Sequence, residues 1–260
     1  DIISADGGYS HSLAVDQAGE VYAWGRNNYS QTTIPEIDAP AIQVASGYTH
    51  SLVLTEDGNV IGFGRDNKGQ STVPDGLSNI KAITAGREHN LALTESGSVI
   101  AWGRNDYGQC SVPEGLTDVI SISAGYFHSL ALKEDGTVVV WGDSTYGQAT
   151  LPEDLEGVTF IDAGGYHNLA LKADGSVVAW GRNNYGQAEV PDGLNQVKSI
   201  TAGTVHNIAI KNDGTMVGWG RNNYGQAEIL TGLNPANFSG VNLRGADLSG
   251  TNISGVQLDE

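Results

Sequence analysis

Six histidines occupy equivalent positions along the chain, and histidine is the side chain whose charge changes most readily near neutral pH. They recur every 39 residues, at His11, His50, His89, His128, His167 and His206. Neutral imidazole nitrogens are common ligands of Zn²⁺, so a ring of equivalent histidines would suggest a metal centre. The first question is therefore whether the fold can bring these six imidazoles together.

The repeat that carries the histidines argues against a metal site. Equivalent positions in neighbouring sheets lie about 10 Å apart, whereas Zn²⁺ requires ligand nitrogens at about 2.0–2.1 Å. Every copy also places its histidine at the turn into a second strand, as expected for a residue of the scaffold. We expect the histidines to be structural hydrogen-bonding groups, and we expect neither a metal nor a cofactor.

Other reactive side chains do not combine into a catalytic arrangement. Ser12, Ser51 and Ser129 follow their histidines, but adjacent strand residues point to opposite faces. No glycine-rich phosphate loop precedes a helix, because no stretch shows helical periodicity. Four Asp-Gly pairs lack the spaced acidic ligands of a calcium loop and are assigned to turns: Asp57-Gly58, Asp135-Gly136, Asp174-Gly175 and Asp213-Gly214. We predict a protein without enzymatic activity.

The histidines belong to a repeat of 39 residues that runs without insertion or deletion. A Trp-Gly step keeps the same period at Trp24, Trp102, Trp141, Trp180 and Trp219, with Phe63 in the remaining copy. A Gly-Gln step follows at Gln70, Gln109, Gln148, Gln187 and Gln226, with Ser30-Gln31 as the variant. A period of this length indicates one supersecondary unit copied in space.

One unit, residues 158–196, has the pattern of a small antiparallel meander. The predicted strands are Val158–Gly164, His167–Lys172, Ser176–Trp180 and a short fourth strand at Ala188–Pro191. Asp174-Gly175 accepts the positive φ angles of a tight hairpin between the second and third strands. Such a unit cannot bury both faces of its sheet alone, but units packed around an axis form a β-propeller. A linear β-solenoid is the alternative.

The segment Ala124–Leu132 (AGYFHSLAL), with Asp135-Gly136, Trp141-Gly142 and Gly147-Gln148 after it, closely resembles the regulator of chromosome condensation (RCC1) repeat. All six copies match, over about residues 1–230. The resemblance implies an all-β propeller, which in this family usually has seven blades. With six copies, three arrangements stay open: a closed six-bladed ring, an open arc, and a ring completed by the tail or by another chain.

We assign residues 1–234 to the propeller and residues 235–260 to a tail with a period of five. Large apolar residues mark the period, at Phe238, Leu243, Leu248, Ile253 and Leu258. This pattern resembles the pentapeptide-repeat family, which implies a short β-helical tail. Five pentapeptides make little more than one coil, which is too short to be stable alone. The tail is expected to pack on the propeller edge, to mediate self-association, or to begin a longer β-helix.

Charge and composition restrict the class of partner. The formal net charge of −17, from 30 acidic and 13 basic residues, repels nucleic acid on average. No apolar run reaches the length of a membrane helix, so membrane insertion is not expected. The single cysteine, Cys110, cannot form an internal disulfide. We expect an extracellular or cell-surface location, with the cytoplasm as the alternative.

The two rims of the propeller are predicted to differ. Successive turns of a meander alternate between the rims, so the first and third turns of every copy share one of them. That rim collects nine of the ten tyrosines and six of the seven arginines, whereas the opposite rim collects carboxylates. Tyr and Arg are the side chains that most often anchor protein interfaces.

The predicted protein-binding residues therefore come from these two turns. They are Tyr9, Tyr48, Arg87, Tyr126, Phe127 and Tyr166 in the first turn, and Arg26, Tyr29, Arg65, Lys68, Arg104, Tyr107, Asp143, Tyr146, Arg182, Tyr185, Arg221 and Tyr224 in the third. The third-turn residues recur in most copies, so building the blade is the alternative role for them. The positions that break the repeat, such as Lys68, Asp143 and the two residues before each histidine, are the better candidates for function.

The leading hypothesis is a non-enzymatic propeller that binds another protein through this Tyr/Arg rim. The short repeat is similar to that of propeller-type β-lactamase inhibitory proteins, so the resemblance implies inhibition as one form of binding. The uniform period of 39 residues leaves no room for the inserted wedge that the nucleotide exchange factors of this family carry. The second hypothesis is a glycan-binding or adhesive surface protein, with several equivalent weak sites. The third is a structural subunit of a larger assembly, joined through residues 235–260.

Overall fold

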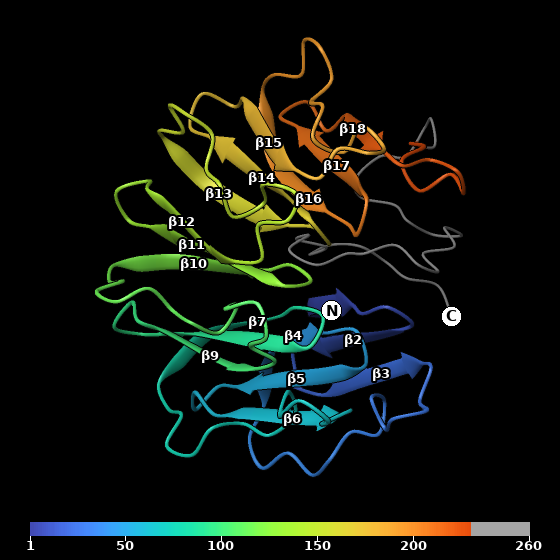
Figure 1. The fold of residues 1–260 in the computed structure, drawn as a ribbon. Coiled ribbons are helices and arrows are strands. Elements are labelled where there is room, and N and C mark those ends of the chain that lie inside the picture. The colour runs from blue at the N-terminus through green and yellow to red at the C-terminus, as the bar shows by residue number, and fades with distance from the viewer. Residues whose placement is uncertain (230–260) are drawn as a thin grey trace.

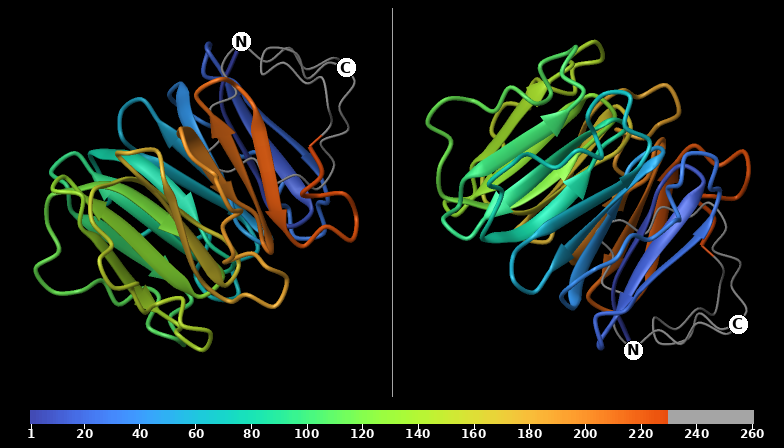
Figure 2. Two further views of the ribbon diagram at one scale, coloured as in Figure 1. Left: turned by 90° about the horizontal axis from the view of Figure 1, so that it is seen from above. Right: turned by 90° about the horizontal axis from the view of Figure 1, so that it is seen from below.

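The computed structural model describes residues 1–229, which form six three-stranded antiparallel sheets and no helix. Each sheet corresponds to one 39-residue repeat, and the six sheets are arranged around a common axis as the blades of a β-propeller (Figures 1 and 2). The predicted fold class is confirmed. The described part of the chain therefore offers no helix that could cross a membrane.

The three strands of each blade follow one another in the sheet. The blades consist of β1 (Ile2–Gly7), β2 (His11–Asp16) and β3 (Val21–Gly25); β4 (Ala41–Ser46), β5 (His50–Thr55) and β6 (Val60–Gly64); β7 (Ile80–Ala85), β8 (His89–Thr94) and β9 (Val99–Gly103); β10 (Val119–Ala124), β11 (His128–Lys133) and β12 (Val138–Gly142); β13 (Val158–Ala163), β14 (His167–Lys172) and β15 (Val177–Gly181); and β16 (Val197–Ala202), β17 (His206–Lys211) and β18 (Met216–Gly220). The first strands of successive blades contact one another, so they are the strands nearest the axis.

The fourth strand predicted at residues 188–191 is not formed, so that prediction was wrong. Gly181 ends β15 with a φ of 102°, which turns the chain out of the sheet. The Asn183 side-chain oxygen then accepts a hydrogen bond from the Ala188 backbone N–H at 3.0 Å. Pro191 has no N–H to offer to a ladder. These residues therefore close a local turn instead of extending the blade.

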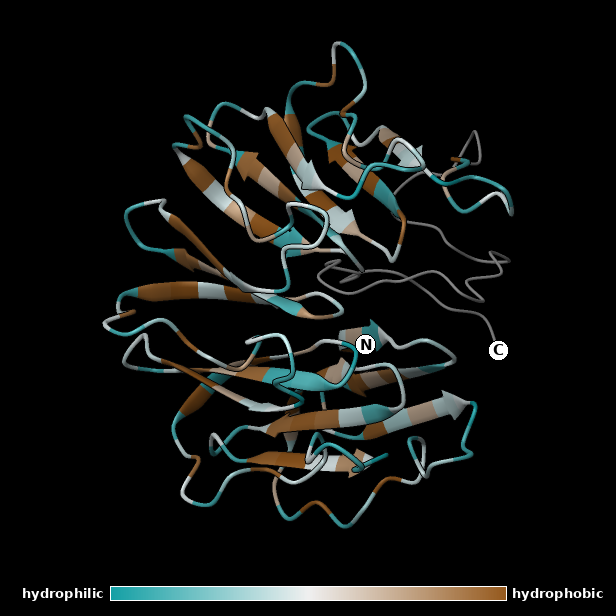
Figure 3. Ribbon diagram, in the orientation of Figure 1, coloured by the Kyte–Doolittle hydropathy of each residue, from teal (hydrophilic) through white to brown (hydrophobic). Residues whose placement is uncertain are grey.

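The hydrophobic core is divided among the junctions between blades. At the junction of the fourth and fifth blades, Leu130 and Leu132 are fully buried against Val158, Ile161 and Trp180 of the following blade. Equivalent clusters fill the other four junctions between successive blades. Figure 3 shows that apolar residues are concentrated on the strands and polar residues in the turns. Each blade is therefore stabilised by its neighbours.

A buried hydrogen-bond relay crosses every one of these junctions. His128 Nε2 lies 2.7 Å from the Asn168 side-chain oxygen of the next blade. The Asn168 side-chain nitrogen donates in turn to the Gln148 carbonyl at 2.8 Å. Because the nitrogen of Asn168 is used for that carbonyl, its oxygen faces the imidazole, and His128 must donate from Nε2. We call this arrangement the histidine relay.

The relay repeats at all five junctions with one of two middle residues. Asn90 and Asn207 act as Asn168 does, while Ser51 and Ser129 accept from the histidine and donate to the glutamine carbonyl. In three blades the tryptophan Nε1–H donates to the same carbonyl, as in Trp180 to Gln148 at 3.1 Å. The structural role predicted for the histidines is confirmed.

Close packing at the relay explains one invariable glycine of the repeat. A Cβ atom on Gly125 would overlap the imidazole carbon Cε1 of His128 and lie 2.7 Å from the Gly164 carbonyl oxygen of the next blade. The position three residues before each histidine is therefore a glycine, because a larger residue there would displace the adjacent blade.

Within residues 1–229 the six blades form an arc that does not close on itself, while a ring completed by the tail or by another chain lies outside the described residues. Each blade packs on the next from the first to the sixth, but no equivalent packing joins β16–β18 to β1–β3 within residues 1–229. Trp24 of the first blade is 51% exposed, whereas the other four tryptophans are 6–7% exposed. Among residues 1–229, the first blade has no neighbour at this position of the kind that covers it in every other blade.

Replacement of Asn168 by alanine should lower the free energy of unfolding by about 2 kcal/mol, because it leaves the buried His128 N–H without an acceptor. Replacement by serine should cost less than half of that, since Ser51 and Ser129 fill the same position in other junctions. Urea unfolding of the two variants provides the comparison. Equal losses for alanine and serine would show that the relay does not stabilise the junction.

Stability should fall as the pH decreases from 6.5 toward 4. Burial lowers the pKa of His11, His50, His128 and His167 from 6.5 to about 4, and that of His89 to about 3. In this window the unfolded chain binds protons that the folded chain excludes, which costs about 1.4 kcal/mol per pH unit for each histidine. Urea unfolding across this range measures the slope.

The variant His128→Gln supplies the control. Its free energy of unfolding should depend less steeply on pH, by the contribution of the one proton that His128 no longer binds in the unfolded chain. The other buried histidines should contribute as before. The lowered pKa values of turn aspartates, such as Asp174 and Asp213, add to the loss only below about pH 5, where the unfolded carboxyls with an ordinary value of 3.8 begin to bind protons, so the upper part of the window reports the histidines. A flat profile between pH 6.5 and 4.5 would contradict the burial of neutral histidines.

Candidate functional site

The first and third turns lie together on one rim, as predicted. Tyr107 of a third turn and Phe127 of the next first turn have ring centroids 5.0 Å apart, and Tyr146 and Tyr166 are 5.4 Å apart. On the opposite rim, the hairpin residue Asp135 and the linking-loop residues Leu155 and Glu156 line a common depression. The structure therefore brings the tyrosines and arginines to one rim and the hairpin carboxylates to the other.

The first-turn residues form a continuous group, which we call the first-turn cluster: Tyr9, Tyr48, Arg87, Tyr126, Phe127 and Tyr166. It begins on the first blade, where Tyr9 stacks on Tyr48 with ring centroids 4.1 Å apart. The Arg87 guanidinium of the third blade lies 4.8 Å from the Tyr48 ring centroid and 5.5 Å from that of Tyr126. Cation–π attraction thus joins three successive turns.

The cluster continues to the last blades. Tyr126 and Tyr166 meet edge to face with ring centroids 5.4 Å apart, and Arg87 also lies 5.4 Å from the ring centroid of Phe127. The Tyr126 hydroxyl lies 3.2 Å from the Thr204 hydroxyl of the sixth blade. Contacts between first turns therefore link the whole arc, from the first blade to the sixth, on one rim.

Members of the cluster differ in accessibility. Tyr9 is 59% exposed, while Phe127 is 7% exposed and lies beneath Arg87 and Arg104. Tyr48, Arg87, Tyr126 and Tyr166 are half-buried. Burial raises the pKa of Tyr48 and Tyr166, so both hydroxyls remain protonated at neutral pH. A ligand would meet the rings and hydroxyls of tyrosines, with Phe127 supporting them from below.

Most third-turn residues connect blades. The arginine of one blade lies over the tyrosine of the preceding blade at 4.9–5.1 Å, in the pairs Arg65–Tyr29, Arg182–Tyr146 and Arg221–Tyr185. Arg221 also lies 5.4 Å from the ring centroid of Tyr224. Because these pairs recur with the repeat, we interpret them as part of the scaffold, which was the alternative role stated for them.

Two positions break the third-turn pairing. Lys68 replaces the tyrosine of the second blade and forms an ion pair with Asp106 at 3.4 Å. Asp143 replaces the arginine of the fourth blade, where it is buried and accepts hydrogen bonds from Thr145 and Gln148 in its own turn. As Tyr107 has no arginine from the fourth blade above it, the ring lies instead beside Phe127.

Arg104 and Arg26 have polar partners. Arg104 pairs with Glu88 at 2.7 Å and with Asp106 at 2.8 Å. Arg26 can donate to the side-chain oxygen of Asn28 at 3.0 and 3.2 Å when the Asn28 amide is turned so that this oxygen faces the guanidinium. Glu88 and Thr204 lie in the two positions before a histidine that the sequence already indicated as candidates, although they were not among the predicted protein-binding residues. Sequence reasoning did not identify Asp106.

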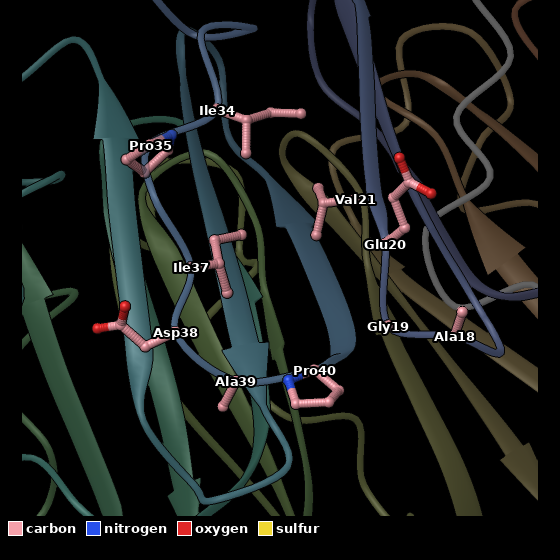
Figure 4. A pocket seen from close by; sticks show the side chains of 10 residues that line it. All are labelled: Ala18, Gly19, Glu20, Val21, Ile34, Pro35, Ile37, Asp38, Ala39 and Pro40. Atoms are coloured by element: carbon pink, nitrogen blue, oxygen red, sulfur yellow. The ribbon is translucent and has the colours of Figure 1, made fainter.

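Outside this rim, the described residues include a shallow depression and a partly buried thiol. The depression in Figure 4 lies beside the first blade, where the side chains of Val21, Ile34 and Ile37 face inward and the carboxylates of Glu20 and Asp38 lie on opposite sides. No group of three or more metal-ligating side chains occurs within residues 1–229. Burial raises the pKa of Cys110 to about 12, which removes it as a nucleophile.

The fold and this rim define a repeat-built β-propeller with one aromatic and arginine-rich surface. The family model for the regulator of chromosome condensation (RCC1) repeat matches residues 2–31, 41–70, 80–109, 119–148, 158–187 and 197–226. The chain belongs to the RCC1 repeat family. A model of pentapeptide repeats matches residues 233–260, which confirms the second resemblance, although the predicted β-helical tail lies outside the described residues.

Solved structures give the same fold. The chain is 23% identical to human WBSCR16, with a TM-score of 0.73, covering 87% of this chain and 78% of that one. It is 24% identical to yeast RCC1 (Prp20) in a complex with Kap60, with a TM-score of 0.72, covering 85% and 70%. A structure of Prp20p from Saccharomyces cerevisiae gives 23% identity, a TM-score of 0.73, and coverage of 87% and 72%. Comparison with curated proteins finds no match.

Proposed function

We propose that this propeller is a non-enzymatic module that binds another protein through the first-turn cluster. The observation that carries the proposal is the loss of repeat symmetry at this position. The histidine, tryptophan and glutamine columns are nearly uniform, because every junction imposes the same contacts on them. At the position two residues before the histidine, three blades carry tyrosine and the other three carry Arg87, Gly165 or Thr204. Junction packing therefore does not fix the residue at this position, although the cluster forms one continuous surface.

The composition of the cluster suits a protein interface. Tyrosine and arginine are enriched among the residues that contribute most to binding free energy, since they bury large area at low conformational cost. Tyr9 supplies an exposed ring, and Tyr48 and Tyr126 supply half-buried rings beside the Arg87 guanidinium. Yeast RCC1 (Prp20) has been solved bound to Kap60, and Prp20p has been described with binding to Gsp1p and histones. These structures support protein binding as the general activity.

Arg87 indicates the chemistry of the central contact. Its Nε, like those of Arg182 and Arg221, is buried without a hydrogen-bond partner, and no carboxylate of residues 1–229 forms an ion pair with its guanidinium. Arg87 differs from these two in lying at the centre of the first-turn cluster. Arginine binds carboxylates through paired, charge-assisted hydrogen bonds. The net charge of −17 does not prevent a carboxylate from approaching Arg87, because charges more than about 8 Å away are largely screened at physiological ionic strength. We infer that the partner presents a loop with an aspartate or glutamate that reaches Arg87.

The test is capture from the native source followed by affinity measurement with the purified partner. Arg87→Ala should weaken binding by at least tenfold, as expected for the loss of an anchoring residue worth about 2 kcal/mol. Tyr224→Ala is the matched control, because Tyr224 is 84% exposed on the same rim but lies outside the first-turn cluster. Its affinity should stay within twofold of the original chain.

Two results would contradict the proposal. If the original chain and Arg87→Ala bind the partner with equal affinity, the first-turn cluster is not part of the interface. Binding that depends equally on Tyr107, Tyr146 and Tyr185, and that a simple saccharide competes away, would support several equivalent glycan sites instead.

A further inference from the structure

Tyr126, in the first turn of the fourth blade, contacts four other blades. The Arg87 guanidinium of the third blade lies 5.5 Å from its ring centroid, and the ring centroid of Tyr166 in the fifth blade lies 5.4 Å away. Tyr126 also reaches beyond its neighbours. Its ring centroid is 6.5 Å from that of Tyr48 in the second blade, and its hydroxyl is 3.2 Å from that of Thr204 in the sixth. One side chain therefore connects the second blade to the sixth across the arc.

Gly165 makes room for this long reach. It occupies in the fifth blade the position that Tyr126 has in the fourth and Thr204 in the sixth. A Cβ atom on Gly165 would lie 3.4 Å from Tyr126 Cε2, 3.2 Å from Thr204 Cγ2 and 2.8 Å from the Thr204 carbonyl oxygen. A longer side chain at Gly165 would therefore enter the space in which Tyr126 and Thr204 meet.

The first turns are also joined through their backbones, in two runs. In one run, the Tyr126 N–H donates to the Gly165 carbonyl at 3.1 Å, and the Gly165 N–H donates to the Thr204 carbonyl at 3.2 Å. In the other, the Tyr48 N–H donates to the Arg87 carbonyl at 3.2 Å. The first run covers the fourth to sixth blades, and the second covers the second and third. The ring of Tyr126 belongs to the first run and contacts both residues of the second.

An arc depends on such a contact more than a closed ring does. In a closed ring, packing of the last blade on the first fixes the angle between neighbours. Within residues 1–229, strand packing joins successive blades, so small changes of angle at the junctions between the second and sixth blades add up. A side chain that links blades that are not neighbours opposes this accumulated motion.

We propose that Tyr126 is a positioning residue that clamps the arc, with Gly165 admitting its ring and Thr204 receiving its hydroxyl. The clamp sets the distance between the part of the first-turn cluster on the second and third blades and the part on the fifth. For the proposed function, on which this consequence rests, a partner that contacts both parts would recognise one curvature of the arc. By linkage, binding of that partner would favour the same curvature.

The distance between the second and sixth blades tests the clamp in the full chain, without a partner. Spin labels on Glu56→Cys and Asn212→Cys, in a Cys110→Ser background, report this distance by pulsed electron paramagnetic resonance. Glu56 and Asn212 are exposed at equivalent hairpin positions on the opposite rim, so the labels do not touch the first-turn cluster. Ser71 occupies the position of Cys110 in the second blade, which shows that the repeat accepts serine there.

Tyr126→Ala should lengthen the mean distance between the labels and broaden its distribution, because contacts with blades on both sides are lost. Gly165→Thr should do the same, since the new side chain enters the path of the Tyr126 ring. Threonine is compatible with a folded blade at this position, as Thr204 shows. Tyr9→Ala is the matched control, because it removes an equal ring that stacks on Tyr48 of the adjacent blade, and it should leave the distance unchanged.

Two results would overturn the clamp. Identical distance distributions in the original chain, Tyr126→Ala and Gly165→Thr would show that the arc is held without Tyr126. An equal change in Tyr9→Ala would show that loss of any first-turn ring loosens the arc. A urea midpoint close to that of the labelled original chain shows that the blades of each variant remain folded.

Affinity for the purified partner of the capture experiment separates the clamp from the proposed function. Gly165→Thr removes no side chain of the first-turn cluster, yet it should weaken binding by about tenfold or more, as expected when anchoring residues are displaced. A changed distance with unchanged affinity would support the clamp and contradict the proposed interface. An unchanged distance would overturn the clamp, while Arg87→Ala would still decide the proposed function.

Discussion

The structure depends on one buried interaction, the hydrogen-bond relay from a histidine of one blade, through Asn or Ser of the next, to a glutamine carbonyl. A three-stranded sheet cannot bury both of its faces, so each blade gains stability only from the blades beside it. Apolar contacts supply most of the attraction, but they have little directional preference. The relay adds direction, because it requires the imidazole, the amide or hydroxyl, and the carbonyl to meet in one geometry inside a dry junction.

Placing all the invariant contacts inside the junctions leaves the turns free to vary. Apart from Trp24 and Gln226, the residues of the histidine, tryptophan and glutamine columns are buried, whereas the two residues before the histidine lie at the rim. A tyrosine there can be replaced by Arg87 or Thr204 without disturbing the core. The third-turn pairs, such as Arg182 over Tyr146, occupy an intermediate position, since they are at the surface and still join two blades. The scaffold and the candidate site therefore share a rim but differ in how strictly the repeat constrains them.

Much of the fold could be predicted from the sequence, because its period places the same residues at every junction. The histidine column, the Asp-Gly hairpins and the Trp-Gly step were enough to derive antiparallel blades and a structural role for the imidazoles. The fourth strand was predicted wrongly, since the side chain of Asn183 competes for the backbone N–H of Ala188. Whether the ring closes depends on contacts between the first and last copies, about which the repeat itself carries no information.

For the candidate site, the sequence predicted which rim the residues occupy but not the contacts that they make. Alternation of turns correctly placed the tyrosines and arginines on one rim. It did not reveal that Arg65, Arg182 and Arg221 stack on tyrosines of the preceding blade, or that Phe127 is buried, because both depend on the relative position of two blades.

The same junction also has a consequence for how the number of blades can change. Serine and asparagine are interchangeable in the middle of the relay, and every blade carries a donor edge and an acceptor edge of the same design. Insertion of a whole 39-residue unit between any two blades would therefore recreate two standard junctions in place of one. Blade count in such a protein can change by duplication or loss of a single copy, with no compensating substitution elsewhere.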